Sequence, residues 1–375
     1  MRVTHIFKAA GLSGAEAHIV TLSVALQDEG FESRLLVLIE PGRPPTALFE
    51  AARARGIPYD VVPIAHHLDF TVVQKIVPLL NSSRVQIAHT HMFHGDLFGT
   101  LAARLVGLTV VQSRHNDDKF RRVWAVRLLM RALAAQAKTV IAISDSLVSF
   151  VRDVEGVPGS KIVRIHYGLD PATVTMRARP GALRSELGIG RDVPLIGAVG
   201  RLTEQKGLRY LIEAFPRVRG LAPDARLVIA GDGPLRGMLE AQAAPLGDAV
   251  RFLGWRDDAP SVMADLDVVC VPSLWEGFGL VTLEAMALSK PIVASRVSAL
   301  SEIVVHGETG LLAPPADSAA LADAITPLLT DPARARAMGE RGRARLEKEF
   351  TVQRMARQHA VVYREAASRV PEFRA

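Results

Sequence analysis

The sequence predicts an α/β protein built from two doubly wound, Rossmann-like domains that face a central cleft. Two observations lead to this prediction. A chain of 375 residues is long for one hydrophobic core and comfortable for two. Apolar runs typical of strands alternate with helical patterns along the whole chain, which favours repeated βαβ units and parallel sheets. Two such domains would place the carboxyl ends of their strands, where ligands bind, on opposing walls of one cleft.

Strands are predicted wherever a short apolar run is bounded by turn residues. These runs cover residues 3–7, 33–39, 61–64, 85–89, 110–113 and 140–143, and then 195–199, 226–230, 250–253, 268–272 and 291–294. Helical patterns include residues 15–29, 97–105, 208–218 and 281–288, and a long one from about 351 to 369. Residues 173–183 hold Pro180 and Gly181 and little periodicity, so they are predicted to link domains 1–175 and 182–351.

Composition limits the classes of function. The chain is 49% hydrophobic and 22% charged, which indicates a folded globular protein. Its single cysteine, Cys270, can form no internal disulfide and is expected to be inert core. No apolar run reaches the ~18 residues of a membrane span, and no signal-peptide pattern is present, so we expect a cytoplasmic location. The net charge of +6 permits anionic partners, but aromatics at 5% and the lack of a nucleic-acid motif argue against nucleic acid.

One basic segment, residues 119–131, stands out from the scattered arginines. Apolar residues there alternate with the five basic residues Lys119, Arg121, Arg122, Arg127 and Arg131. The pattern is typical of an amphipathic helix that rests on an anionic membrane surface. An ordinary surface helix with its apolar stripe on the core explains it equally well.

The most informative segment for function is residues 275–287. It follows an apolar strand pattern, carries two glycines and places Glu276 in a loop and Glu284 in the helix that follows. A glycine-bearing turn into a helix N-terminus suits a diphosphate. Two carboxylates facing the same crevice could accept hydrogen bonds from hydroxyls, so the segment predicts a nucleotide-sugar pocket. A simple loop with a glutamate at the helix dipole is the alternative.

Three further loops follow predicted strands. Gly11–Glu16 contains Gly14 and opens a helix, so its amides could approach a phosphate. Arg201 and Lys206 lie in the loop 199–207, where they would neutralise a leaving diphosphate. Trp255 ends another strand and could stand beside a nucleotide base or pack in the core.

Taken in order, these motifs resemble the GT-B retaining glycosyltransferases of family 4. The resemblance spans nearly the whole chain and is strongest over residues 195–315. It rests on residues 200–207, Gly231-Asp232-Gly233-Pro234, Glu276 to Glu284 and His306–Leu312, with weaker matches at Ser13–Glu16, His115, Ile143-Ser144 and Gly168–Asp170. It implies an acceptor-binding N-terminal domain, a donor-binding C-terminal domain, and a terminal helix, 352–375, that packs back on the N-terminal domain.

The resemblance also implies roles for particular residues. Arg201 and Lys206 would bind the donor diphosphate, Glu284 the ribose hydroxyls and Glu276 the sugar hydroxyls. The pocket would be completed by Gly14, Trp255 and the amides of Phe278, Gly279 and Leu280. His115 matches a histidine that contacts the donor sugar near the reaction centre. The implied mechanism is a front-face displacement that requires no metal or other cofactor, with UDP favoured over GDP as the carrier. The acceptor would be a glycolipid or a saccharide, as in the synthesis of lipopolysaccharide and other polysaccharides.

Three departures from the family pattern bear on donor choice. Ser13 replaces the first glycine of a pair, Tyr167 stands where an asparagine is common, and Ser298-Ala299 replaces a Gly-Gly turn. The histidines His89, His91 and His94 lack an acidic or cysteine partner for a metal, so packing or acceptor-cleft roles are favoured. Two other functions stay open: a nucleotide-sugar epimerase of the same fold, and a non-catalytic protein that binds nucleotide sugars.

Overall fold

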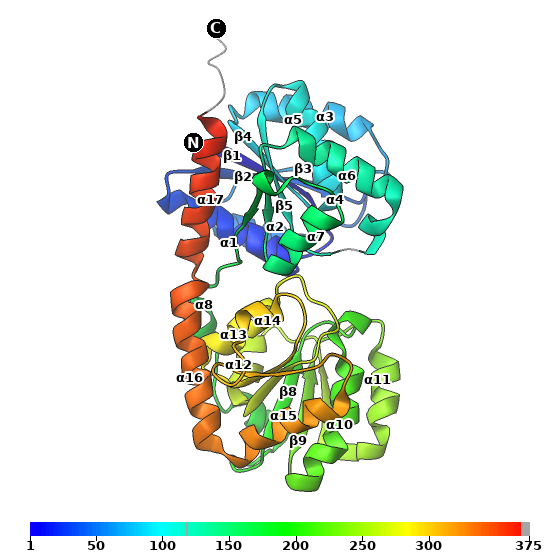
Figure 1. The fold of residues 1–375 in the computed structure, drawn as a ribbon, viewed down its shortest axis with the longest axis vertical. Coiled ribbons are helices and arrows are strands. Elements are labelled where there is room, and N and C mark those ends of the chain that lie inside the picture. Colours follow the sequence, from blue (N-terminus) through cyan, green and yellow to red (C-terminus); the bar gives the residue numbers. More distant parts are fainter. Residues whose placement is uncertain (118, 369–375) are drawn as a thin grey trace. The chain divides into compact units, whose positions relative to one another are not determined.

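The computed structural model describes residues 1–117 and 119–368. It separates into two compact units. The first unit comprises residues 1–168 and the C-terminal segment from Val352, and the second comprises residues 169–351. Each unit is an open parallel sheet with helices on both faces (Figure 1). The prediction of two doubly wound α/β domains is therefore confirmed.

The sheet of the first unit has the strand order β3-β2-β1-β4-β5-β6-β7, and all of its pairs are parallel. The strands are β1 (Arg2–Lys8), β2 (Glu32–Ile39), β3 (Tyr59–Pro63), β4 (Ile87–His91), β5 (Thr109–Arg114), β6 (Thr139–Ala142) and β7 (Ile162–Arg164). The helices are α1 (Gly14–Asp28), α2 (Thr46–Ala54), α3 (Thr71–Ser82), α4 (Met92–His94), the π-helical turn η1 (Gly95–Gly99), α5 (Thr100–Leu105), the 3₁₀ turn η2 (Lys119–Arg122), α6 (Trp124–Gln136), α7 (Asp145–Asp153), the 3₁₀ turn η3 (Gly159–Lys161) and α17 (Val352–Ala367).

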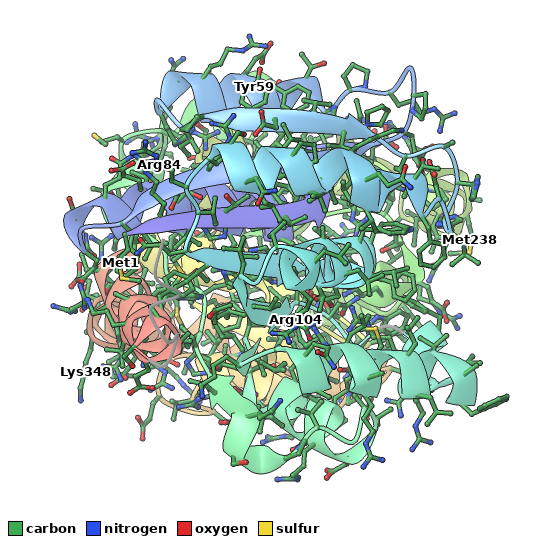
Figure 2. All side chains as sticks on the ribbon, turned by 90° about the horizontal axis from the view of Figure 1, so that it is seen from above. Met1, Tyr59, Arg84, Arg104, Met238 and Lys348 are labelled. Atoms are coloured by element: carbon green, nitrogen blue, oxygen red, sulfur yellow. The ribbon has the colours of Figure 1, made fainter. Side chains whose placement is uncertain are left out.

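The C-terminal helix α17 belongs to the first unit, as the family resemblance implied. It lies alongside α1 (Figure 1), and both helices bury apolar side chains against one face of the sheet. Tyr363 of α17 packs with Leu22 and Leu26 of α1 and with Val3 of β1. Met1 packs against the same cluster and lies next to this helix (Figure 2). Residue 369, where the sequence predicted the helix to end, lies outside the described residues.

The sheet of the second unit has the strand order β10-β9-β8-β11-β12-β13, again with parallel pairs only. Its strands are β8 (Leu195–Val199), β9 (Arg226–Ala230), β10 (Val250–Gly254), β11 (Val268–Val271), β12 (Ile292–Ser295) and β13 (Leu311–Ala313). Its helices are α8 (Pro171–Thr175), α9 (Ala182–Leu187), η4 (Glu204–Lys206), α10 (Leu208–Leu221), α11 (Arg236–Ala243), η5 (Ala244–Ala249), α12 (Ala259–Asp265), α13 (Leu280–Ala287), α14 (Leu300–Ile303), α15 (Ser318–Thr330) and α16 (Pro332–Glu349).

The residues predicted to link the domains, 173–183, are partly helical and lie within the second unit. Helix α8 forms because Asp170 accepts a hydrogen bond from the amide of Ala172, while Pro171 occupies the first helical position. Gly181 precedes α9 with a φ of 87°, a conformation that glycine adopts without strain. Local capping therefore gives this segment structure that its weak periodicity did not reveal.

Each sheet has one point at which the strand order reverses, and each point marks a place for a ligand. In the first unit it lies between β1 and β4, and in the second between β8 and β11. In open α/β sheets ligands bind outside the carboxyl ends of the strands at such points. The loops that follow these four strands are therefore the places to examine for chemistry.

Candidate active site

The loops at the carboxyl edge of the second sheet are joined to one another by backbone hydrogen bonds. Leu202 donates to the carbonyl of Asp232 at 2.9 Å, and Gly231 donates to that of Gly254 at 2.7 Å. Across the reversal point, the amide of Leu274 donates to the carbonyl of Gln205 at 2.8 Å. This network holds the loops after β8, β9, β10 and β11 as one rigid rim.

Lys206 and Glu276 meet across the reversal point between β8 and β11. The Lys206 ammonium donates to Glu276 Oε2 at 2.6 Å, and both side chains are largely buried. Gly207, with a φ of 60°, makes this approach possible: a Cβ built there would lie 2.0 Å from the carbonyl oxygen of Pro272. The structure thus brings together two residues that the sequence analysis selected from separate motifs.

Helix α13 begins at Leu280, four residues after Glu276, and its first turn lies at the same rim. Gly279 precedes it with a φ of 91°, and a Cβ there would lie 2.8 Å from the side chain of Leu300. The first N–H groups of a helix have no intrahelical acceptor, so the amides at Leu280 and beyond can receive an anion. The Phe278 side chain is buried and contacts Phe350, so only its backbone can serve a ligand.

Glu284 lies in the second turn of α13. Burial raises the pKa of its carboxyl group, and nearby Arg177 opposes that effect. A carboxyl group held in a partly dry setting makes strong hydrogen bonds to hydroxyls because water competes less for it. This placement fits the hydroxyl-binding role that the resemblance implied.

Two further predicted donor residues lie at the same rim but point to solvent. Arg201 is exposed; its carbonyl accepts from the amide of Thr203, while its side chain makes no hydrogen bond or ion pair to the described residues. Trp255, which follows β10, is 68% exposed, and its indole N–H donates to Asp257 at 2.9 Å. The exposed indole excludes the core-packing alternative and leaves its face available for stacking.

His115 lies in the first unit, just after β5, and both of its ring nitrogens are engaged. Nε2 hydrogen-bonds to Nδ1 of His91 at 2.9 Å, and Nδ1 to the hydroxyl of Tyr167 at 2.6 Å. Burial lowers the pKa of His115 to about 3, with further contributions from Arg121 and Arg114. The ring is therefore neutral at pH 7 and fixed in orientation, and Tyr167, one of the departures from the family pattern, is what fixes it.

Gly14 is the first residue of α1 and is exposed. The amide of Ser13 donates to the Glu16 carboxylate at 3.2 Å, which closes the first turn as a capping box. One turn further along α1, the ring of His18 stacks on Tyr167 with centroids 3.9 Å apart. The Gly14 turn and His115 are thus neighbours within the first unit.

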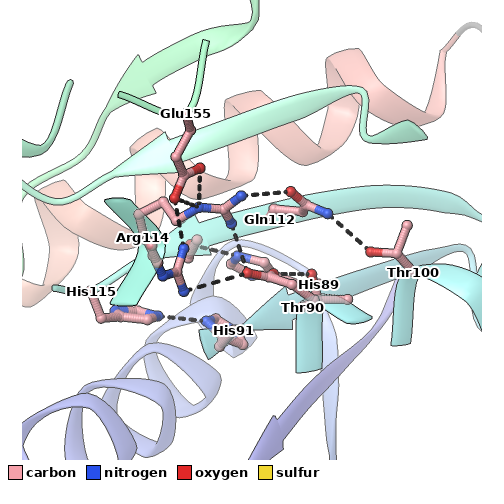
Figure 3. Close-up of polar contacts among 11 residues, drawn as sticks. His89, Thr90, His91, Thr100, Gln112, Arg114, His115 and Glu155 are labelled. Atoms are coloured by element: carbon pink, nitrogen blue, oxygen red, sulfur yellow. Dashed lines mark hydrogen bonds and ion pairs between the residues drawn. The ribbon is translucent and has the colours of Figure 1, made fainter. Parts of the chain in front are cut away.

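Beneath His115 lies a buried ion network that the sequence analysis missed. Arg114 pairs with Glu155 at 2.9 Å (Figure 3). Arg114 also pairs with Asp96 at 2.8 Å, and Arg121 pairs with Glu155 at 2.8 Å. Burial raises the pKa of Asp96 against the opposing pull of Arg114 and Arg121. No sequence pattern links these four residues, because they come from η1, β5, η2 and the turn that follows α7.

This network corrects the prediction of one amphipathic helix over residues 119–131. The segment instead forms the turn η2 followed by helix α6, which begins at Trp124. Arg121 is buried in the ion network and cannot face a membrane. Arg122, Arg127 and Arg131 are exposed, and the side chain of Lys119 lies outside the described part of the structure.

A layer of histidines fills the space between the first sheet and helices α1 and α17. His5 and His89 are paired across β1 and β4, and His91 shares their face. Their ligand atoms lie within 4.8 Å of one another, which would suit a metal ion. However, His89 already bonds Tyr363 at 2.6 Å and Ser113 at 2.7 Å through its two nitrogens. The electrostatic neighbours of these rings are other histidines, and burial lowers the pKa of all three rings. We therefore interpret the trio as part of a hydrogen-bonded packing layer.

Comparison with known proteins identifies the family of this chain. The family profile described as "Glycosyltransferase Family 4" matches residues 12–173, and that described as "Glycosyl transferases group 1" matches residues 193–331. The alpha-maltose-1-phosphate synthase of Mycolicibacterium smegmatis is 31% identical over 317 residues, which cover 77% of this chain and 81% of that protein. The chain belongs to glycosyltransferase family 4. It is a hexosyltransferase-type enzyme that uses a nucleotide sugar, so the predicted family and enzyme class are confirmed.

Two further proteins resemble this family 4 glycosyltransferase. The lipopolysaccharide core biosynthesis mannosyltransferase LpsB of Rhizobium meliloti is 32% identical over 273 residues, which cover 69% of this chain and 72% of that protein. The Anabaena protein HepE, solved with UDP and glucose, superposes with a TM-score of 0.85 at 23% identity over 97% of this chain and all of that one. The structural similarity to HepE confirms the GT-B fold. Within the described residues, no helix of this glycosyltransferase is both long and apolar enough to cross a membrane.

Proposed function

We propose that this glycosyltransferase moves a sugar from a UDP-sugar to an acceptor hydroxyl with retention of configuration, in the synthesis of a cell-envelope glycolipid or polysaccharide. The observation that carries the proposal is the Lys206–Glu276 pair, 2.6 Å apart, beside the N-terminus of α13 at a strand-order reversal. A cation, free helix amides and carboxyl groups at one rim supply partners for a diphosphate and for sugar hydroxyls. Crystals of HepE contained UDP and glucose, which favours UDP over GDP as the carrier.

Each of these rim residues has a role in the proposed reaction. The bond between the anomeric carbon and the diphosphate oxygen breaks while the acceptor oxygen bonds to the same face of that carbon. The leaving phosphate oxygen takes the acceptor proton. Arg201, Lys206 and the α13 amides stabilise the negative charge that develops on the phosphate. Glu276 holds the sugar hydroxyls, Glu284 the ribose, and Trp255 stands beside the base.

The donor proposal is tested by binding and turnover together. A thermal-shift panel of UDP, GDP and their sugar derivatives should show the largest stabilisation with a uridine nucleotide. Incubation with a labelled UDP-sugar and a mixture of saccharide and glycolipid acceptors should then release UDP and label an acceptor. An epimerised donor without transfer would instead establish the epimerase alternative, and an intact bound donor would establish the non-catalytic one.

Replacing Glu284 with alanine is expected to raise the Kd for UDP at least about tenfold. The substitution removes the acceptor of two ribose hydrogen bonds, and bonds to charged groups contribute about 1.5–3 kcal/mol each. Isothermal titration of UDP measures the effect. Glu240→Ala, on the exposed face of α11 in the same unit, is the matched control. An unchanged Kd in the Glu284 variant would remove that residue from the donor site.

We further propose that the surface around α6 contacts an anionic membrane, where a glycolipid acceptor would reside. Four apolar side chains are exposed there: Phe120, Val123, Trp124 at 72% and Leu128 at 57%. They lie among the exposed arginines of the same segment, a combination that favours anionic interfaces.

The double change Trp124→Ala and Leu128→Ser should lower partitioning onto phosphatidylglycerol-containing vesicles about tenfold or more, since each buried apolar side chain contributes about 1.5–3 kcal/mol. Vesicle sedimentation measures it. Leu105→Ser, a change at a 72% exposed leucine on α5, is the control. Equal sedimentation of all three proteins would show that this surface faces water only.

A further inference from the structure

A cavity opens at the amino edge of the sheet in the second unit, opposite the loops of the proposed donor rim. Its volume is about 220 Å³, the share of about seven water molecules at ~30 Å³ each. One wall is formed by the first residues of β9 and β10, and another by the loop between α9 and β8. Since β9 and β10 are five residues long, roughly 15 Å of sheet separates the cavity from the rim. The cavity is therefore distinct from the proposed donor site.

Two arginines stand on the sheet side of this cavity. Arg226 begins β9, and Arg251 is in register with Val228, two residues further along β9, so all three side chains project from one face of the sheet. The Arg226 side chain is half-buried and makes no hydrogen bond or ion pair to the described residues. Arg251 pairs with the exposed carboxylate of Asp248, which also lines the cavity, at 3.0 Å. The three charged side chains leave a net positive charge, and most of the guanidinium N–H donors have no acceptor in the described structure.

The facing wall is a loop that the protein holds in place from behind. Helix α9 ends at Gly188, whose φ of 65° suits glycine, and the amide of Ile189 donates to the carbonyl of Arg184 at 2.9 Å. The buried Arg184 side chain donates to the carbonyls of Gly190 at 2.7 Å and Val193 at 2.8 Å. The amide of Gly190 has no acceptor in the part of the chain that the structure describes. The loop is therefore shaped in advance and carries an N–H group that a ligand can use.

These groups select the chemistry of the ligand. Two guanidinium groups and an amide present donors from two walls, which suits a tetrahedral phosphate better than a planar carboxylate with only two oxygens. The net positive charge attracts a phosphate monoester, which carries about 1.5–2 negative charges at pH 7. Apolar Leu187 and Ile189 also line the cavity, whose volume admits a small organic body but not a nucleotide sugar. We infer that the cavity binds a small phosphate monoester through Arg226, Arg251 and the amide of Gly190. The inference does not depend on the proposed transferase function.

The test is isothermal titration of the full chain in the presence of saturating UDP, which would occupy the proposed donor rim. The probes are inorganic phosphate, glycerol phosphate, ribose phosphate and phenyl phosphate, with glycerate as the carboxylate. We expect at least one ester to bind more tightly than inorganic phosphate, because its organic body contacts the apolar wall. Arg226→Gln and Arg251→Gln should each raise the Kd for that ester about tenfold or more, since each removes hydrogen bonds between charged groups. The Kd for UDP should not change in these variants.

Gly190→Leu tests the cavity without removing a charge. A Cβ on Gly190 would have a methyl group of Val193 at 3.7 Å as its nearest neighbour beyond the adjoining residues, so a side chain there takes up space at the cavity wall. We expect this variant to weaken the ester about tenfold or more and to unfold near the original temperature when no ligand is present. Arg217→Gln is the matched control, because it removes an exposed arginine of the same unit that pairs with Asp323.

Several results would overturn the site. These are no binding of any ester at millimolar concentration, displacement of the ester by UDP, tighter binding of glycerate than of any ester, and equal binding by the Arg217 and Arg226 variants. Equal affinity for inorganic phosphate and every ester would indicate an adventitious ion only. The titrations are repeated without UDP, so a protein that fails to bind UDP would refute the donor proposal and would still decide whether the cavity binds a phosphate monoester.

Discussion

Lys206→Ala is expected to lower kcat/KM by two to three powers of ten. In the proposed reaction the ammonium group stabilises the negative charge that develops on the leaving diphosphate, and one preorganised donor in such a role lowers the barrier by about 2.7–4 kcal/mol. The loss should fall mainly on kcat, because the interaction strengthens as the anomeric bond breaks. Steady-state kinetics with varied donor, at fixed acceptor, separate the two parameters.

The same substitution also leaves the largely buried Glu276 without its cation, so loss of folded protein must be excluded. Thermal unfolding in the presence of UDP measures the folded fraction. Arg217→Ala breaks an exposed ion pair with Asp323 in the same unit and should leave kinetics and stability near their original values. Turnover at the original rate by a folded Lys206→Ala protein would show that this residue carries no part of the phosphate chemistry.

Sequence reasoning selected the residues of the proposed donor rim because they lie in short motifs at strand ends. Lys206 and Glu276 belong to separate motifs, yet any parallel sheet with β8 beside β11 brings their loops together. The strand predictions were accurate because buried parallel strands are largely continuous apolar runs, which are visible in the sequence. The three-residue strands β7 and β13 escaped because such short segments carry no periodicity of their own.

Long-range polar contacts could not be predicted in this way. Arg121 was placed on a membrane-facing surface because its neighbours in sequence alternate between basic and apolar. Its partners, Asp96 and Glu155, come from other elements, and only the fold brings them within reach. His91 and Tyr167 likewise bracket His115 from a strand and a loop distant in sequence. A local sequence pattern shows how polar and apolar side chains are spaced along one element. Which polar side chains are buried against one another depends on the tertiary packing of several elements.

The histidine layer makes the first unit sensitive to acid, and this is the second large effect that we expect. Burial lowers the pKa values of His5, His18, His89, His91 and His359, to about 3 for His5 and about 4 for His359. In the unfolded chain a histidine titrates near 6.5. Above pH 6.5 both states are neutral and the layer contributes no pH dependence. Below pH 6.5 these histidines bind protons in the unfolded chain but stay neutral in the folded unit. The free energy of unfolding therefore falls as the pH falls.

Each such histidine costs about 1.4 kcal/mol per pH unit once the pH is well below 6.5. Five of them should remove on the order of 5 kcal/mol between pH 6.5 and 5.5, which is comparable with the total stability of a domain. Urea unfolding at a series of pH values measures the loss. Hydrogen-exchange mass spectrometry, corrected for intrinsic exchange rates, should show the first sheet opening before the second, whose unit contains His306 as its single histidine.

His359→Leu tests the cause of this sensitivity. The His359 ring bonds the carbonyl of Met355 through Nδ1, while Nε2 is buried without a partner, so a leucine replaces a poorly satisfied group. We expect little change in stability at pH 7.5 and a slope below pH 6.5 that is smaller by about 1.4 kcal/mol per pH unit, one proton's share. Arg364→Leu, at an exposed position on the same helix, controls for the substitution. A slope identical to that of the unaltered protein would place the acid sensitivity elsewhere, because His359 would then bind the same number of protons in the folded and unfolded states.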